Sequence, residues 1–271
     1  MPESVKYVSK SVKFCADLPP VPTVRVVRGG CVFLREWRVP MRSMPIWHLY
    51  WCKTPGARII FADRIISCAP DMIWLLPPYT VFATDTEQVF EHFFLDFILE
   101  GGLFEHLKRE PLQFPASEYM RQLDDCLSTQ LSPLSACSLI FSLLLKIGPE
   151  HFLPAGQPPI DQRILRALNK IYAMLDSGRI GSFDNRFLSR LAGMSVDNFQ
   201  RLFRHEMGIS PKRYVTNLRL ELAVRLLKSR KLSIEEIASR TGFANRSHFS
   251  KAFKSALSVS PAQFRKHRLN E

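Results

Sequence analysis

The chain has 271 residues, enough for two globular domains, and its formal net charge of +12 favours a polyanionic partner. The opening residues lack the apolar core of a signal peptide, and the most apolar stretches are too short to span a bilayer, so we expect a cytoplasmic protein with no membrane partner. No CxxC pair is present, which argues against a zinc site, and we expect reduced thiols at Cys15, Cys31, Cys52, Cys68, Cys126 and Cys137.

Residues 23–97 have the texture of short β-strands. Val, Ile, Phe and Trp are concentrated in eight runs, which are TVRVV, CVFLREW, IWHLYWC, RIIFA, RIISC, MIWLL, TVFAT and VFEHFFLDF. Turn signals separate these runs, among them Gly29-Gly30, Thr54-Pro55-Gly56 and Ala69-Pro70-Asp71. Short strands with turns between them predict an antiparallel sandwich or barrel.

The periodicity changes to that of helices after Gly101. Apolar residues recur three and four positions apart in three predicted helices, Leu103–Arg109, Ala116–Thr129 and Pro133–Ile147. These helices either cover the strand domain or pair with a second subunit. Prolines and a glycine after His151 then mark a domain boundary. We expect a β domain over 1–100, a helical dimerisation segment over 101–150, a linker over 151–160 and a second domain over 161–271.

The second domain is predicted to be helical throughout. One apolar stripe runs along 161–176, so this segment is expected to be a supporting helix. A longer helix is predicted over 211–228, because Ser210 is a good N-cap and Pro211 suits the first helical position. At ~1.5 Å per residue this helix is about 27 Å long, close to the ~34 Å between neighbouring major-groove faces of DNA.

Two further helix starts follow the long helix. Ser233 and Glu236 form a capping box, which places a short helix at Ile234–Arg240. Ser260-Pro261 repeats the start signal of the long helix and predicts a last short helix.

The C-terminal domain contains the same motif twice, in Leu188–Tyr214 and Ile237–Phe264. Gly193 aligns with Gly242, and further matches are Phe199 with Phe249, Phe203 with Phe253, Ser210-Pro211 with Ser260-Pro261, and Tyr214 with Phe264. Each copy has a short helix, a glycine turn and a second helix. This is the layout of a helix-turn-helix, whose second helix fits the major groove of DNA.

The positive charge of the chain lies with this repeat. Residues 158–271 carry 22 Lys and Arg against 9 Asp and Glu, whereas residues 1–157 carry 15 against 16. The net charges of the two parts are therefore +13 and −1. Because the arginines lie within helix-turn-helix frames, we expect double-stranded DNA as the partner rather than acidic lipid.

The outward faces of the two second helices supply the expected DNA contacts. Gln200 and Arg201 are the expected base readers of the first unit, and Arg204 is an expected phosphate contact. In the second unit Asn245 is either a helix cap or a reader. The alternative for each residue is a solvated polar group on an exposed helix. The full predicted set is Ser195, Asp197, Gln200, Arg201, Arg204, Lys212, Arg213, Asn245, Arg246, Ser247, His248, Ser250, Lys251 and Lys254.

These motifs resemble the DNA-binding domain of the AraC/XylS family of bacterial transcription regulators. The resemblance covers Asp161–His267 and includes the stretch GFANRSHFSKAFKSALSVSPAQFR, although Ala256-Leu257-Ser258 replaces the usual aromatic residue and glycine. It implies an α+β multidomain protein, with a cupin-like antiparallel β barrel or sandwich and following helices before a C-terminal all-α domain with two helix-turn-helix units. It also implies a homodimer, a small-molecule effector and RNA polymerase as a further partner.

The front half resembles the cupin-like effector domain of such regulators through Leu75-Leu76-Pro77-Pro78. Its aromatic density suits a carbohydrate or related polar ligand, with the alternative that these rings fill the core. The predicted ligand-binding residues are Arg38, His48, Trp51, Lys53, Tyr79 and His92. A metal-dependent cupin enzyme needs clustered histidines with a glutamate, and this stretch has only two histidines, so we expect no metal and no other cofactor.

Three classes of function remain at this stage. The first is a regulator controlled by a small effector. The second is a DNA-repair enzyme fused to a DNA reader, which needs an activated cysteine that no local motif indicates, so we expect no enzyme. The third is a regulator that works without a ligand, and composition does not separate it from the first.

Overall fold

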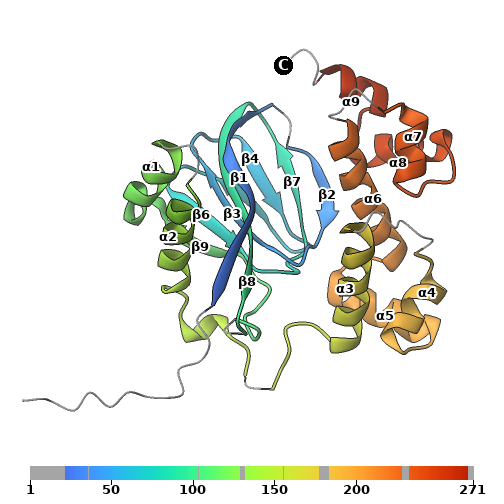
Figure 1. Cartoon of the computed structure of the whole chain (residues 1–271), viewed down its shortest axis with the longest axis horizontal. Coiled ribbons are helices and arrows are strands. Elements are labelled where there is room, and N and C mark those ends of the chain that lie inside the picture. The colour runs from blue at the N-terminus through green and yellow to red at the C-terminus, as the bar shows by residue number, and fades with distance from the viewer. Residues whose placement is uncertain are drawn as a thin grey trace, which may run out of the picture.

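A computed structural model describes residues 22–35, 37–102, 104–128, 132–154, 156–176, 183–227 and 232–267. A β domain with two helices on its outer side stands beside a domain made of helices (Figure 1). This arrangement confirms the predicted α+β multidomain fold. Several positions that entered the sequence predictions lie outside the described residues, namely Cys15, Leu103, Thr129 and Lys228. The other five cysteines are free thiols, as expected.

The β domain consists of two facing antiparallel sheets. The larger has the strand order β1-β8-β3-β6-β9 and the smaller the order β2-β7-β4-β5. The strands are β1 (Thr23–Leu34), β2 (Val39–Arg42), β3 (Trp47–Cys52), β4 (Ala57–Ile60), β5 (Ile65–Cys68), β6 (Met72–Leu76), β7 (Phe82–Thr86), β8 (Phe90–Glu100) and β9 (Leu112–Pro115).

Strand β3 is buried on both faces, and its side chains alternate between two separate core clusters. Trp47, Leu49 and Trp51 pack with the helices that cover the large sheet, while Tyr50 and Cys52 pack between the sheets. Successive side chains of a strand point to opposite faces, so one short run supplies both clusters. Burying such side chains contributes roughly 1.5–3 kcal/mol each.

The helices of the front half are α1 (Met120–Ser128) and α2 (Pro133–Leu144). Leu123 of α1 and Leu139 of α2 belong to the same core cluster as Trp47, so these helices cover the large sheet. The predicted helix at Ala116–Thr129 begins instead with a 3-10 turn at Ala116–Glu118. The predicted helix at Pro133–Ile147 ends at Leu144, before Ile147. Pairing with a second subunit and the domain boundaries at 100, 150 and 160 remain predictions.

Two strand predictions were wrong because of pairings that local sequence does not reveal. Gly29 and Gly30 form no turn: they pair with Leu95 and Phe94 inside the long strand β1. A β-bulge between Val26 and Arg28 absorbs the irregularity there. Strands β2 and β9 were not predicted, because each contains a proline and few strand-forming residues.

The predicted helix at Leu103–Arg109 was also wrong. Leu107 forms a β-bridge with Phe152. The Lys108 amide donates to the His151 carbonyl at 2.9 Å, and the Leu153 amide donates to the His106 carbonyl at 2.8 Å. Since these backbone groups already have long-range partners, a local helix has nothing to gain there.

The C-terminal domain has two helical units joined by one long helix. The helices are α3 (Gln162–Asp176), α4 (Asn185–Ala192), α5 (Val196–Met207), α6 (Pro211–Leu227), α7 (Ile234–Arg240), α8 (Arg246–Leu257) and α9 (Pro261–His267). Leu218 of α6 packs with the first unit, and Leu220 and Ala223 pack with the second. The capping box of Ser233 and Glu236 is present, as predicted. The predicted joining role of α6 is therefore confirmed.

Candidate DNA-binding surface and its contacts with the β domain

The first helix-turn-helix unit is built by local capping. Gly193 ends α4 with φ of 67°, a left-handed conformation that suits glycine. Ser195 then starts α5, because its side-chain oxygen accepts from the Asn198 amide at 3.4 Å. Phe199 and Phe203 are fully buried on the inner side of α5. The opposite side of α5 is therefore left for solvent or a partner.

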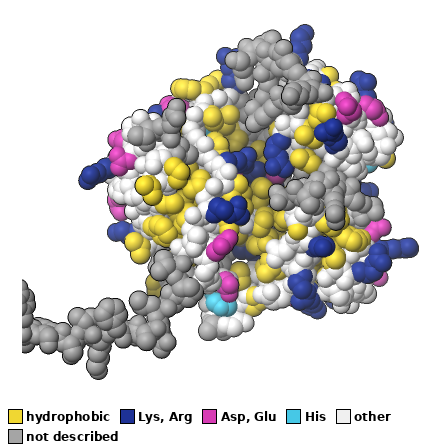
Figure 2. Space-filling view, viewed as in Figure 1, with side chains coloured by type: hydrophobic (Ala, Val, Ile, Leu, Met, Phe, Trp, Pro, Cys, Tyr) yellow, Lys and Arg dark blue, Asp and Glu magenta, His cyan; other side chains and the backbone are white. Residues whose placement is uncertain are grey.

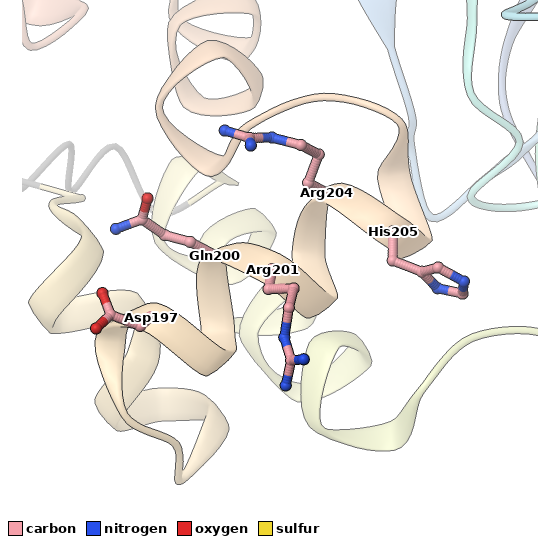
Figure 3. A pocket seen from close by; sticks show the side chains of 5 residues that line it. All are labelled: Asp197, Gln200, Arg201, Arg204 and His205. Atoms are coloured by element: carbon pink, nitrogen blue, oxygen red, sulfur yellow. The ribbon is translucent and has the colours of Figure 1, made fainter.

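The outer face of α5 carries the predicted DNA contacts. Asp197, Arg201 and Arg204 are exposed, and Gln200 is half-buried. A shallow cavity is lined by these four side chains and His205, which the sequence did not single out (Figure 3). In this view Gln200 and Arg204 extend to one side of α5, and Arg201 extends to another. Arg201 donates to Asn198 Oδ1 at 3.3 Å, a contact that solvent or DNA can replace.

The second unit repeats this geometry on α8. Asn245 accepts from the His248 amide at 2.8 Å, so it acts as the helix cap. The His248 ring packs edge-on against Phe243, with ring centroids 5.6 Å apart. The remaining predicted contacts on α8 are exposed or half-buried, namely Arg246, Ser247, Ser250, Lys251 and Lys254. The exposed face of α8 therefore combines cations with small polar side chains.

Two more predicted contacts lie in the first turn of α6. Lys212 and Arg213 are both exposed. Ser210 caps the helix here, because its side-chain oxygen accepts from the Arg213 amide at 3.3 Å. Lys and Arg side chains are spread over the surface of the C-terminal domain (Figure 2). This distribution suits a long polyanion better than one compact anion.

The β domain contacts the C-terminal end of α5. Arg109 donates to both the carbonyl oxygen and the carboxylate of Glu206, each at 3.1 Å. Its Nη1 also lies 3.8 Å from the sulfur of Met207. Both side chains of the ion pair are largely buried. The C-terminal end of α5 is therefore fixed by a residue from outside the C-terminal domain.

A second contact joins the β domain to α3 and α6. The carbonyl oxygen of Ser43 accepts hydrogen bonds from the hydroxyls of Tyr172 and Tyr214, the latter at 2.8 Å. The two hydroxyls also contact each other at 2.6 Å. Asn217 donates to the Met41 carbonyl. One loop after β2 thus contacts a helix of the first unit and the joining helix.

Arg42 extends this contact into the interior of the β domain. Its Nη1 donates to Glu221 of α6 at 3.3 Å, and its Nη2 donates to the Tyr50 hydroxyl at 3.0 Å. The guanidinium also lies over the Phe82 ring, 5.2 Å from its centroid. The side chain is buried, so the ion pair with Glu221 is shielded from solvent. Arg42 therefore links Tyr50, in the interior of the β domain, directly to Glu221 of α6.

Two of the predicted ligand-binding residues are buried between the sheets. His48 Nδ1 lies 2.6 Å from Asp96 Oδ1, and both side chains are 1% exposed. Burial lowers the pKa of His48 despite the attraction of Asp96. Burial alone would raise the pKa of Asp96, but His48, Arg28 and Arg42 lower it well below its usual value. Asp96 is therefore a buried carboxylate, compensated by several donors.

His92 lies in the same interior among aromatic rings. Its ring centroid is 4.5 Å from that of Trp37 and 5.7 Å from that of Phe94. Burial lowers the pKa of His92 to about 3, so the ring is neutral at physiological pH. His92 is thus held as a packed aromatic side chain with Cys52 Sγ 3.7 Å from its Nδ1.

The other four predicted ligand-binding residues lie elsewhere. Trp51 points to the opposite face of the large sheet, where its Nε1 donates to the Pro70 carbonyl at 2.8 Å. Lys53 bonds Glu91 at 2.6 Å, and Arg38 bonds Asp85 at 3.3 Å. Tyr79 contacts Asn169 of α3. The structure therefore does not bring the six residues into one pocket.

Sequence reasoning missed the polar residues that join the interior to the helices. Arg42, Tyr50 and Asp96 were not among the predicted site residues. One signal was available, because Asp96 interrupts an otherwise apolar run in FFLDF, and a buried carboxylate needs partners.

Among the described residues no group of three or more His, Cys, Asp or Glu is arranged to hold a metal. None of the described helices has the length and apolar character required to cross a bilayer.

Known proteins share both the repeat and the fold. A helix-turn-helix domain family model matches residues 188–267. An uncharacterised HTH-type transcriptional regulator of Haemophilus influenzae is 43% identical over 79 residues, which are 29% of this chain and 26% of that protein. The "Probable transcriptional regulator LumQ" of Photobacterium leiognathi is 26% identical over 193 residues, covering 71% of this chain and 70% of that protein.

A solved structure extends the likeness to both domains. ToxT from Vibrio cholerae strain SCE256 aligns with a TM-score of 0.62 at 16% identity, covering 90% of this chain and 94% of that chain. The fold and the two capped units define a DNA-binding protein of the tandem helix-turn-helix class. Residues 188–267 belong to the helix-turn-helix domain family, and the chain is similar to HTH-type transcriptional regulators.

Proposed function

We propose that this protein is a sequence-specific regulator whose affinity for DNA is controlled by a small effector bound in the β domain. The observation that carries the proposal is the pair of capped helices, α5 and α8, which present exposed cations on two units joined by α6. In this proposal α5 and α8 enter successive major grooves of double-stranded DNA.

The chemistry of each face supports base reading together with phosphate binding. Arginine donates two hydrogen bonds to guanine, and glutamine both donates to and accepts from adenine, so Arg201, Gln200 and Arg246 are the proposed base readers. Lys212, Arg213 and Lys254 are proposed to position the protein on the phosphates. Asn245 is assigned to capping, since its side-chain oxygen accepts from the His248 amide.

Effector control is supported by the contacts between the domains. Arg109 bonds the end of α5, and Arg42 bonds Glu221 of α6, so a shift in the β domain alters the position of both helices. ToxT from Vibrio cholerae strain SCE256 has been solved with a bound unsaturated fatty acid, which supports small-molecule binding by the shared fold. A carbohydrate remains the effector class predicted from the aromatic residues. Homodimer formation and contact with RNA polymerase are further proposals.

The test of DNA binding is a salt titration of the intact chain on a specific duplex and on random duplexes. We expect the logarithm of the binding constant to fall linearly with the logarithm of salt concentration, with a slope that reports the phosphates contacted. A chain with no salt-sensitive affinity for any duplex would contradict the proposal. If DNA binds but no small molecule changes that affinity or the thermal stability, a ligand-independent regulator is the correct description.

The variant Arg109→Gln tests whether effector binding in the β domain is transmitted to α5, because it removes the ion pair with Glu206. We expect this variant to bind DNA but to lose most of the effector's influence on affinity. Arg121→Gln is the matched control, because Arg121 is an exposed arginine on α1. An unchanged response in Arg109→Gln would show that the contact at α5 does not carry the signal.

A further inference from the structure

A cavity opens on the side of the β domain where the two sheets have free edges. It lies between β5 of the small sheet, β6 and β9 of the large sheet, and the segment after α2, with a volume of about 600 Å³. Small-molecule sites are usually clefts of about 300–1,000 Å³, so this cavity has the size for a ligand. None of the six predicted ligand-binding residues lines it.

The walls of the cavity combine apolar surface with positive charge. Ile66, Trp74 and Ile147 provide apolar surface, and Arg64, Lys146 and His151 provide basic side chains. No Asp or Glu is among the described residues that line it. The fold brings these side chains together from two distant segments, the turn before β5 and the segment after α2.

Ion pairs near the cavity leave its basic groups accessible. Arg64 bonds Asp63 at 3.1 Å, and His151 lies 3.5 Å from Glu150. Both carboxylates are more than two-thirds exposed, at 69% and 68%. Exposed pairs of this kind contribute at most about 1 kcal/mol, so an anion in the cavity displaces them at little cost. Lys146 has no ion pair among the described residues, which leaves its charge open to a ligand.

We propose that this cavity is the effector site and that it binds a small amphipathic organic anion. A carboxylate head is held by Arg64, Lys146 and His151, and an aliphatic or aromatic body lies against Trp74 and its apolar neighbours. Arginine suits the head because its fork of donors matches a carboxylate. The inference rests on the proposed effector control, and it replaces a neutral carbohydrate by a charged ligand.

The cavity is connected to the first reading helix through its own wall. Pro111 lines the cavity and follows Arg109 by two residues, and Arg109 bonds Glu206 at the end of α5. The neighbouring Lys108 donates its amide to the carbonyl of His151, another lining residue. A ligand that moves Pro111 or His151 therefore moves the segment that holds α5.

The experiment measures binding by calorimetry on the intact chain with two matched pairs of probes. The anions are decanoate and 4-phenylbutyrate, and the neutral controls are 1-decanol and 4-phenyl-1-butanol. We expect the anions to bind at least 10-fold more tightly than the alcohols. The double variant Arg64→Gln with Lys146→Gln is expected to weaken the anions at least 10-fold, while Arg25→Gln, an exposed arginine on β1, leaves Kd unchanged.

Several outcomes would overturn the inference. Equal binding of anions and alcohols, or equal binding by the double variant and the unaltered chain, would show that the basic side chains are not the site. Binding of a neutral monosaccharide such as L-arabinose that changes DNA affinity, without any anion binding, would overturn the cavity and keep effector control. Anion binding at the cavity with no change in DNA affinity would support the site and overturn effector control.

Discussion

The two helix-turn-helix units have the same frame but different surroundings. Each has a capped second helix with two buried phenylalanines, yet α5 carries Asp197 and Glu206 beside its two arginines, while α8 carries Arg246, Lys251 and Lys254 and no acidic residue. The hydrogen bonds from the β domain that are given above reach α3, α5 and α6, and one of them joins Arg109 to the end of α5. None of these bonds reaches α8. The duplication therefore fixes the fold, and charge and domain contacts distinguish the two units.

The largest expected effect is a loss of stability when a core phenylalanine is removed from either unit. Phe203→Ala and Phe253→Ala each remove a fully buried ring, so each should lower the free energy of unfolding by about 3–5 kcal/mol. Phe203 packs against Tyr214, which bonds Ser43, so only Phe203→Ala should also loosen the domain contact. Denaturant titration measures the first effect and hydrogen exchange of the β2 region the second. Equal exchange in both variants would remove the proposed difference between the units.

The next test concerns DNA affinity. Arg201→Ala and Arg246→Ala should each cost about 1–3 kcal/mol on a specific duplex if both arginines read bases. Band-shift titrations on specific and random duplexes separate the two roles. Equal losses on random DNA would mean that these arginines contact phosphate only.

A pH titration distinguishes the β domain from both units. The pKa of His92 is lowered to about 3, below the ~6.5 of an unfolded histidine, so the unfolded chain takes up a proton first as the pH falls. Stability should therefore fall by about 2 kcal/mol between pH 7 and pH 5 on this account, and His48 should add to the fall. His92→Phe should flatten the profile, because it removes the buried imidazole. An unchanged profile in His92→Phe would contradict the assignment.

The smallest effect is expected at the ends of the reading helices. Gly208 ends α5 with φ of 65°, and Ser258 ends α8 with φ of 64°, a conformation that costs a residue with a side chain about 1 kcal/mol. Ser258→Gly should therefore stabilise the second unit by about 0.5–1 kcal/mol, whereas Gly208→Ser should destabilise the first. Thermal unfolding of both variants measures the pair. A loss of stability in Ser258→Gly would show that the serine makes a contact that offsets the strain.

The sequence predicted the C-terminal domain well because its signals are local. The cap at Ser195, the capping box at Ser233 and the turn at Gly193 each depend on a few neighbouring residues, and the structure has all three. The two phenylalanines of each unit lie four positions apart, which is enough to identify the buried face.

Features that depend on distant partners were not predictable in this way. Gly29-Gly30 has the composition of a turn but lies in a strand because β8 pairs with it along its length. The contacts of Arg109 and Arg42 join residues that are 97 and 179 positions apart in the chain. Their long side chains would suit solvent equally well, and only the docking of the two domains decides otherwise.

If α5 and α8 bind one duplex as proposed, helix α6 restricts the spacing of the two sequences that they contact. It has no glycine, and its only proline is at the first position, so it is a stiff spacer that belongs to both cores. Each base pair added between two recognition sequences turns the second by about 35° and moves it about 3.4 Å along the duplex. A rod that neither bends nor stretches cannot follow such a change, so the interval between the two sequences is as much a part of the code as the bases themselves.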